Sequence, residues 1–283
     1  MGLRNTKEYT DAMLNGRIVT GHFRKVPGLA STAYCWADIG MAAGNPPPNY
    51  YASTPLAAEG LDKWRGIFHG DDKSPSEKYL KEIMIVTPTA AMVGAYRLMD
   101  YLLYYPFVDL DDTDPQDMDN TVTLPRYTTG AGVRVMLVAQ APTVGGGQFI
   151  FNYVNQDGVD KTSPTNYCTT TGMNMGTLLT MQPASVGGRG PYLILAEGDT
   201  GVQQITQFTN LVSNGGLGAL VLVVPMADIV ISEINTPVEI YFPYASLGVP
   251  RIYDGAFLNF ICNPAGSITA GLLTGRADFV WTE

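Results

Sequence analysis

The residues most suited to chemistry in this chain are the carboxylates concentrated between residues 109 and 119. The segment DLDDTDPQDMD carries aspartate at six positions: Asp109, Asp111, Asp112, Asp114, Asp117 and Asp119. Calcium takes several carboxylate and carbonyl oxygens from a flexible loop. One interpretation is therefore a calcium site, with ligands from Asp109, Asp111, Asp112 and Asp114.

The spacing of these aspartates does not match an EF-hand loop. Counted from Asp109, the sixth position is Asp114 where an EF-hand has glycine, and the twelfth is Asn120 where it has glutamate. The alternative is a solvated acidic turn, or a partner for arginines such as Arg97 or Arg126. The sequence favours this alternative and leaves the calcium site open.

Other residue types give little support for catalysis. The two histidines, His22 and His69, both fall in an irregular N-terminal region, and neither has a neighbour at metal-ligand spacing. Carboxylate pairs such as Glu233 with Glu239, or Asp254 with Asp278, could serve a glycosidase, but any acidic protein offers such pairs. The glycine runs lack the GKS/T ending of a phosphate-binding loop. The sequence therefore predicts a protein that is not an enzyme and, calcium apart, has no cofactor.

Composition and charge disfavour two further classes of partner, nucleic acid and membranes. Seventeen Lys and Arg against 26 Asp and Glu give a net charge of −9, which disfavours a phosphate backbone, so we expect no direct contact with nucleic acid. The N-terminus lacks the apolar core of a signal peptide and no stretch is apolar enough to span a bilayer, so we expect no membrane association. Three widely spaced cysteines, Cys35, Cys168 and Cys262, suggest reduced and partly buried thiols.

The region 1–78 reads as an extended, irregular N-terminal arm that begins with a short helix and one strand. Asn5 and Glu8 resemble a capping box, and residues 17–26 suit a strand. The following residues are rich in proline and have little periodicity, so we expect them to lie along a neighbouring surface, on this chain or on a second subunit. Aromatic side chains suit such contacts. The interface candidates are Tyr34, Trp36, Tyr50, Tyr51 and Trp64.

Residues 88–105 carry the strongest helical pattern. Thr87 and Pro88 supply an N-cap and a proline at the first helical position. Apolar residues then recur every three or four positions until Pro106. They are Ala91, Ala95, Leu98, Leu102 and Tyr105. The spacing predicts one principal α-helix over 88–105.

Short strands separated by glycine and proline turns account for most of the rest. They are expected at 79–86, 132–139, 148–155, 159–162, 177–182, 192–195, 202–212, 218–224, 238–244, 257–262, 267–273 and 278–281. This spacing predicts a mainly β fold, an antiparallel jelly-roll-like β-sandwich over 79–283 that includes the helix.

Several phrases resemble virion proteins of tailed bacteriophages. They are LMDYLLYYPFVDLDDTD, DNTVTLPRYTTGAGVRVMLVAQAP, FIFNYVNQDGVDKTSP, PYLILAEGDTGVQQI, INTPVEI and PRIYDGAFLNFI. Together they cover the region from about Leu98 to the C-terminus. The region before Tyr79 matches less clearly.

The resemblance implies a viral structural protein attached to the phage head as a decoration, cement or minor capsid protein. It would assemble in the host cytoplasm, lie on the capsid surface and contact other virion proteins, especially the major coat protein. A homo-oligomer, with a trimer favoured, is part of the same expectation. Two alternatives stay open: a carbohydrate- or receptor-binding domain of a fibre or tail, and the main coat protein itself.

Overall fold

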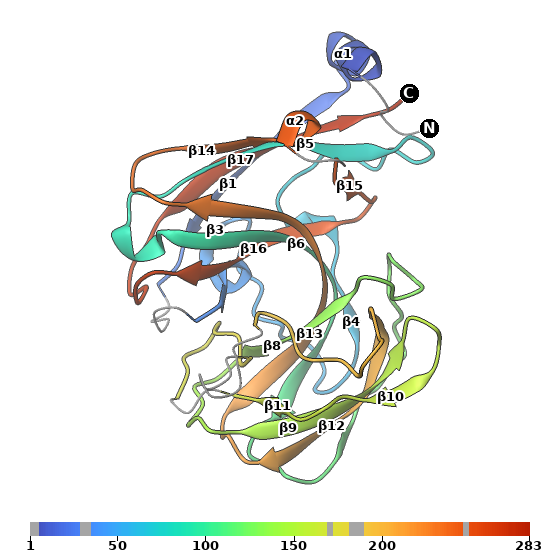
Figure 1. Cartoon of the computed structure of the whole chain (residues 1–283), viewed down its shortest axis with the longest axis vertical. Helices are drawn as coiled ribbons and strands as arrows, with labels where there is room; N and C mark the ends of the chain where they lie inside the picture. Colours follow the sequence, from blue (N-terminus) through green and yellow to red (C-terminus); the bar gives the residue numbers. More distant parts are fainter. Residues whose placement is uncertain (1–5, 29–34, 169–171, 181–189, 246–248) are drawn as a thin grey trace.

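The chain folds into three antiparallel β-sheets that form two lobes, drawn as the upper and lower halves of Figure 1. The computed structural model describes residues 6–28, 35–168, 172–180, 190–245 and 249–283. Its helices are few and short: α1 (Thr6–Leu14), α2 (Phe242–Ala245) and three 3-10 turns, η1 (Ile39–Met41), η2 (Lys63–Arg65) and η3 (Ala90–Met92). This confirms the prediction of a mainly β sandwich fold.

The first sheet, called sheet 1, closes the upper lobe and combines strands from both ends of the chain. Its order is β14-β5-β17-β1-β3, with β15 paired to β5. The strands are β1 (Ile18–Val26), β3 (Ala43–Asn45), β5 (Lys78–Val86), β14 (Val238–Tyr241), β15 (Arg251–Ile252) and β17 (Leu273–Trp281). Because β1 pairs with β17 on one side and β3 on the other, it lies inside the sheet.

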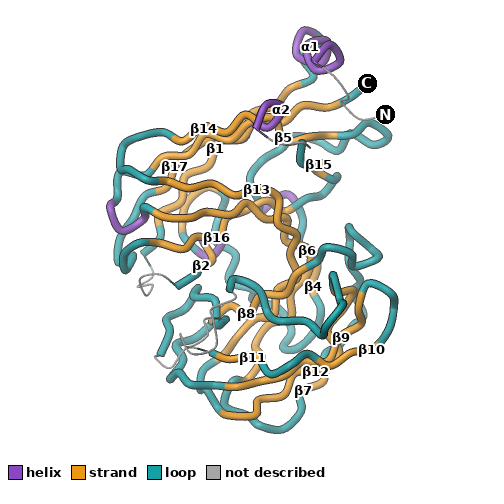
Figure 2. The backbone as a smooth tube through the Cα atoms, viewed as in Figure 1, coloured by secondary structure: helices purple, strands orange, loops and turns teal. Residues whose placement is uncertain are grey.

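The second sheet, sheet 2, runs through both lobes. Its order is β2-β16-β6-β13-β8, with β4 paired to β6. The strands are β2 (Ala37–Asp38), β4 (Glu59–Gly60), β6 (Gly94–Asp109), β8 (Arg134–Ala139), β13 (Leu217–Ile231) and β16 (Phe257–Pro264). Figure 2 shows the long pair β6 and β13 bending from one lobe into the other, and the pairing has three register shifts along its length.

The third sheet, sheet 3, closes the lower lobe with strands from the middle of the chain. Its order is β10-β9-β12-β7, with β11 paired to β9. The strands are β7 (Gln116–Asp117), β9 (Gln148–Asn155), β10 (Asp160–Thr162), β11 (Asn166–Tyr167) and β12 (Val202–Val212). Buried and half-buried residues alternate along β9, as expected for a strand with one face on the core.

Sheet 2 is covered on both faces, and this explains its composition. One face packs against sheet 1 in the upper lobe, through residues such as Leu98 and Phe260, and against sheet 3 in the lower lobe, through residues such as Leu102. The opposite face, which includes Met99 and Val221, is covered by irregular segments. Strands buried on both faces have continuous rather than alternating apolar runs.

The predicted helix over 88–105 is wrong, because this region forms η3 and then β6. Within β6, residues 96 and 98–106 are all buried, so apolar residues occupy nearly every position. A continuous apolar run contains helical spacings by necessity and cannot be assigned from periodicity alone. Pro106 and Phe107 sit at a register shift opposite β13, with Phe107 at a φ of 56°.

Irregular segments replace three predicted strands. Residues 177–180 make only isolated bridges, Ala37 with Thr177 and Val138 with Leu178, and 181–182 lie outside the described residues. Residues 192–195 and 267–272 are also irregular. The described residues contain no helix long and apolar enough to cross a membrane.

Candidate functional site

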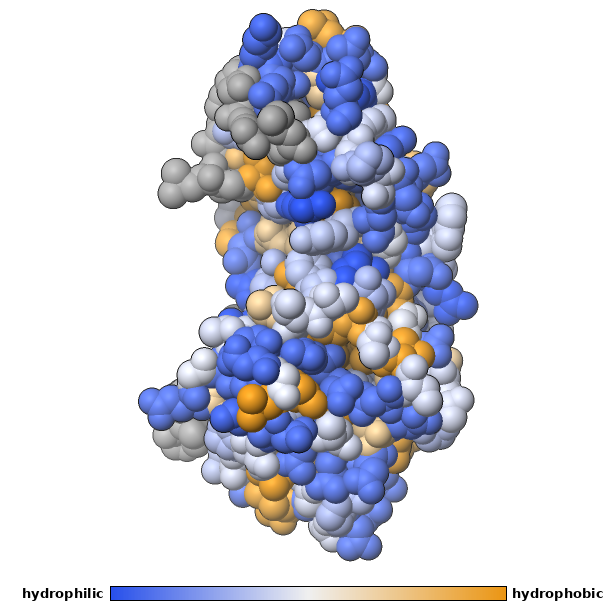
Figure 3. All heavy atoms as spheres, turned by 90° about the vertical axis from the view of Figure 1, so that its right-hand side faces the viewer, coloured by the Kyte–Doolittle hydropathy of each residue, from blue (hydrophilic) through white to orange (hydrophobic). Residues whose placement is uncertain are grey.

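A cleft of about 410 Å³ opens between the two lobes. It is lined from the upper lobe by residues 74–78 and 251–254, and from the loop between β7 and β8 by residues 125–128. Its volume is within the range of ligand-binding clefts. Figure 3 shows the side of the molecule that faces right in Figure 1, where hydrophobic and hydrophilic side chains are mixed over the middle.

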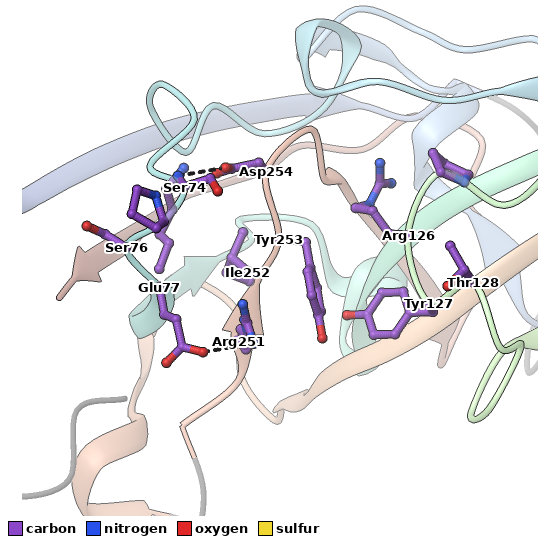
Figure 4. A pocket seen from close by; sticks show the side chains of 13 residues that line it. Ser74, Ser76, Glu77, Arg126, Tyr127, Thr128, Arg251, Ile252, Tyr253 and Asp254 are labelled. Atoms are coloured by element: carbon purple, nitrogen blue, oxygen red, sulfur yellow. Dashed lines mark hydrogen bonds and ion pairs between the residues drawn. The ribbon is translucent and has the colours of Figure 1, made fainter. Parts of the chain in front are cut away.

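Two tyrosines and an arginine form the exposed wall of this interlobe cleft. Figure 4 shows the rings of Tyr127 and Tyr253 next to each other. They meet edge to face with 4.8 Å between centroids. Arg251 lies 4.6 Å from the Tyr253 ring centroid and forms an ion pair of 2.9 Å with Glu77. Tyr127 has a φ of 52°, an unfavourable backbone conformation for a residue with a side chain. Its ring packs against Tyr253 and its carbonyl accepts the Gly130 N–H at 2.7 Å.

A buried ion pair forms the back of the cleft. Arg126 donates two hydrogen bonds to Asp100, of 2.7 and 3.0 Å, and further bonds to the carbonyls of Gly255 and Tyr101. Asp100 also accepts the Phe257 N–H. Burial raises the pKa of Asp100, and the contacts with Arg126 and this N–H oppose the rise. Arg126 therefore joins β6 and the 253–257 turn to the loop between β7 and β8.

A lysine and a histidine lie behind the upper wall. Burial lowers the pKa of Lys78 to about 8 and that of His69 to about 4. Lys78 Nζ lies 3.0 Å from His69 Nδ1 and donates to the Asp71 carbonyl, while His69 Nε2 lies 2.8 Å from the Ala256 carbonyl. This fits a neutral histidine that donates to Ala256 and accepts from Lys78. Both side chains are thus used in fixing the wall.

Two of the carboxylates considered for a glycosidase, Asp254 and Asp278, have separate structural partners. Asp254 accepts the backbone N–H groups of Lys73 and Ser74 at the cleft. Asp278 accepts the Thr20 hydroxyl and lies 3.7 Å from Lys81. All three cysteines are buried, where the sequence suggested partly buried thiols.

The predicted interface residues are in different environments. Tyr34 lies outside the described residues. Tyr51 is buried, its hydroxyl bonded to the buried Asp38, so the prediction for Tyr51 is corrected: it belongs to the core of its own chain. Trp36 is half-buried and packs under Arg97. Tyr50 and Trp64 remain exposed, at 48% and 71%.

The N-terminal region lies along its own chain in its described part. Gly66 lies so close to the Leu258 backbone that a Cβ atom on residue 66 would be 2.7 Å from the Leu258 nitrogen. The next residue, Ile67, donates its N–H to the Leu258 carbonyl at 2.8 Å. With Ile67 buried, the flanking Trp64 and Phe68 point outward and are 71% and 52% exposed. The 63–68 segment therefore presents two large aromatic side chains on a fixed backbone.

The acidic segment forms a turn whose carboxylates bond to nearby backbone and side chains. Asp109 accepts the Asp111 N–H, Asp112 accepts the Asp114 N–H, and Asp111 accepts the Ser213 hydroxyl. Among the described residues, no group of three acidic, histidine or cysteine residues is arranged to hold a metal.

The two arginines suggested as partners for that turn have other partners. Arg97 pairs with Asp228, and Arg126 pairs with Asp100. That suggestion is therefore wrong for both arginines. Asp228 lies on β13 directly opposite Arg97 on β6, a neighbour that only the strand register could reveal.

Comparison with known proteins gives no family. No protein-family model and no curated protein matches the sequence. The solved structures found include a mutant VP2 protein of infectious bursal disease virus in T=1 particles, with 9% identity, 94% of this chain and 78% of that chain covered, and a TM-score of 0.16. The structure of the Gx strain of that virus has 9% identity, covers 94% of this chain and 80% of that chain, and has a TM-score of 0.16. Another T=1 particle derived from that virus has 10% identity, covers 94% of this chain and 78% of that chain, and has a TM-score of 0.15. Scores this low carry no argument about function.

Proposed function

We propose that this protein is a non-enzymatic structural component of a bacteriophage particle, a capsid decoration, cement or minor capsid protein that acts through contacts with other virion proteins. The supporting observation is the 63–68 segment, with Trp64 and Phe68 exposed on a backbone clamped to β16 (Phe257–Pro264). Large aromatic side chains dominate binding energy at protein interfaces. A fixed backbone lowers the entropy cost of burying them in a complex.

The sequence resemblance supplies the kind of partner, which is another virion protein and above all the major coat protein. The net charge of −9 agrees with an outward-facing position, since a surface facing packaged DNA would be repelled. We propose a homo-oligomer, with a trimer favoured, located on the capsid surface.

Co-sedimentation with particles that lack this chain tests the proposal. The double variant Trp64→Ala/Phe68→Ala should bind tenfold or more weakly, because hot-spot aromatics are worth about 2 kcal/mol or more. Val144→Ala is a matched control, since Val144 is 77% exposed in the lower lobe and should be dispensable. Unchanged binding of the double variant would exclude the 63–68 segment as the contact.

The copy number in a cryo-EM map of the intact particle separates the remaining possibilities. Many copies at coat-subunit junctions support a cement or decoration role, and a closed shell of this chain would make it the coat protein. A few copies at a vertex or fibre tip would contradict a shell role and favour adsorption. Light scattering of the purified chain measures the proposed trimer directly.

A further inference from the structure

The outer face of sheet 3 is the side of β9 and β12 that points away from the core of the lower lobe. Buried and half-buried residues alternate along β9, and the half-buried ones lie on this face. The register with β12 places further residues beside them. The centre of the face consists of Ile150, Asn152, Val154, Gln207, Thr209 and Val212. These six side chains are all neutral. Figure 1 shows β9 and β12 at the lower end of the molecule.

Hydrogen bonds between side chains hold this face in a fixed arrangement. The Thr162 hydroxyl donates to Asn152 Oδ1 at 2.7 Å, and Asn152 Nδ2 donates to Gln207 Oε1 at 3.1 Å. Gln207 Nε2 then donates to Asp117 Oδ1 at 2.7 Å. The ladder of bonds therefore crosses all four strands from β10 to β7. Side chains that are already fixed lose less entropy when a partner covers them.

The outer face of sheet 1 differs, because its side chains are charged. Arg276 lies 2.8 Å from Glu82 and 3.4 Å from Glu239. Lys81 lies 3.7 Å from Asp278 on the neighbouring strand. Covering charges with another protein removes them from water, which costs free energy unless well-placed new partners compensate. This cost does not arise at the centre of the sheet 3 face.

Aliphatic side chains lie on both sides of the hydrogen-bond ladder. Val154 is half-buried on one side, and Ile150 is half-buried on the other. Beyond Ile150, at the end of β12, Leu211 and Val212 are 48% and 44% exposed. Apolar surface that leaves water on contact stabilises an association. The face thus combines neutral polar groups that are already paired with apolar side chains that gain from being covered.

We infer that the outer face of sheet 3 is the surface through which copies of this chain associate. A second copy carries the same net charge of −9, so two copies repel each other over most of their surface. They meet with least repulsion at a face whose centre is neutral. Its rim carries both signs, with Asp117 and Asp160 acidic and Lys161 basic. The inference rests on the homo-oligomer of the proposed function and names the surface that forms it.

Sedimentation equilibrium of the purified full chain at two salt concentrations tests the inference. Self-association should strengthen as NaCl is raised from about 0.05 to about 0.5 M, because salt screens the repulsion between the net charges. Association that weakens with salt would indicate a charged contact, such as the face of sheet 1, and would overturn the inference. A chain that stays monomeric at every concentration would overturn it too. Co-sedimentation with particles measures the 63–68 contact separately, so that contact can survive either result.

Two variants place a carboxylate on the face. Ile150→Asp and Val212→Asp should each weaken self-association tenfold or more, because like charges then meet across the contact. Circular dichroism checks that each variant is folded. Val212 lies at the exposed end of β12, so Val212→Asp decides the matter even if Ile150→Asp does not fold.

Val230→Asp is the matched control. It makes the same change at a valine that is 63% exposed on β13 in the upper lobe, and it should leave self-association unchanged. If the two sheet 3 variants associate like the unmodified chain, the surface is wrong while the homo-oligomer stands. An equal loss in Val230→Asp would mean that an added charge anywhere separates the copies, and it would also refute the assignment to sheet 3.

Discussion

The two lobes share one pair of long strands, β6 (Gly94–Asp109) and β13 (Leu217–Ile231), but they are closed in different ways. Sheet 1 of the upper lobe joins the ends of the chain, so that Thr20 hydrogen-bonds to Asp278, 258 positions away. Sheet 3 of the lower lobe uses only strands between residues 116 and 212. Closing the upper lobe therefore requires a much longer loop, and we expect the lower lobe to form first.

The chemistry of the two lobes differs as well. The upper lobe contains both histidines of the chain, the buried Lys25 and Lys78, and ion pairs across sheet 1. On sheet 3, neutral amides and hydroxyls pair instead, as in Asn152 with Gln207 and with Thr162. The upper lobe should thus respond to pH and salt, while the lower lobe should respond mainly to changes in packing.

The largest expected effect comes from the buried pair that joins the lobes. Arg126→Met leaves Asp100, which is 1% exposed, without its counter-ion. Removing one partner of a buried pair costs about 3–5 kcal/mol. Urea unfolding followed by circular dichroism measures the loss.

A double variant distinguishes the loss of pairing from a packing defect. Asp100→Leu/Arg126→Met removes both charges and should recover most of the stability, because a buried pair is often replaceable by apolar residues. If the double variant is as unstable as Arg126→Met alone, then the backbone bonds that Arg126 makes to Gly255 and Tyr101 carry the effect.

The next largest effect is acid sensitivity of the upper lobe. The pKa of His69 is about 4 in the folded protein and close to 6.5 when unfolded. Between these values the unfolded chain binds a proton that the folded chain excludes, so stability falls as pH drops from 6.5 to 4. The total is on the order of 3 kcal/mol.

Hydrogen exchange can report this loss for each lobe separately. Amides of β17 (Leu273–Trp281) should lose protection as pH falls, once the intrinsic exchange rate is corrected, before those of β12 (Val202–Val212). His69→Gln removes the titrating group and should abolish the difference above pH 5. Equal loss of protection in both lobes would contradict the assignment to His69.

The sequence places β8 and β16 of sheet 2 about as well as it places strands with one exposed face, and it fails at the long apolar run of β6. β9 and β12, which face one core, match their predicted limits, 148–155 and 202–212. β6, the central strand of sheet 2, was predicted as a helix. Its apolar run has no polar positions to reveal the period, so only its neighbours β13 and β16 determine its conformation.

The candidate sites were harder to predict, because they combine residues distant in sequence. Arg126 meets Asp100 and Gly255, and Tyr127 meets Tyr253. No local pattern marks these pairs. The interface residues of the arm were predicted from composition, which cannot distinguish a buried aromatic residue from an exposed one. Tyr51 is buried, with its carbonyl bonded to Gln140 and its hydroxyl to Asp38, whereas Trp64 is exposed.

A smaller effect should separate the two outer sheets by salt dependence. Arg276 on β17 bonds to Glu82 at 2.8 Å and lies 3.4 Å from Glu239. Arg276→Met should cost about 0.5–1 kcal/mol at low salt and less in about 1 M NaCl, which screens exposed pairs. Asn152→Ala on sheet 3 is the neutral comparison. Its cost should be the same at both salt concentrations, and a salt-dependent cost there would remove the proposed distinction.

The smallest expected effect is that of calcium on the acidic turn of the lower lobe. Asp109 and Asp112 already accept backbone N–H groups, Asp111 accepts the Ser213 hydroxyl, and Asn210 donates to the Asp109 and Asp112 carbonyls. Calcium binding would have to replace these bonds, so we expect the same unfolding temperature with calcium and with chelator. A bound ion at a hundred times its Kd would instead add about 2.7 kcal/mol. A rise that disappears in Asp111→Asn/Asp114→Asn would establish a calcium site and make the lower lobe, too, dependent on charge.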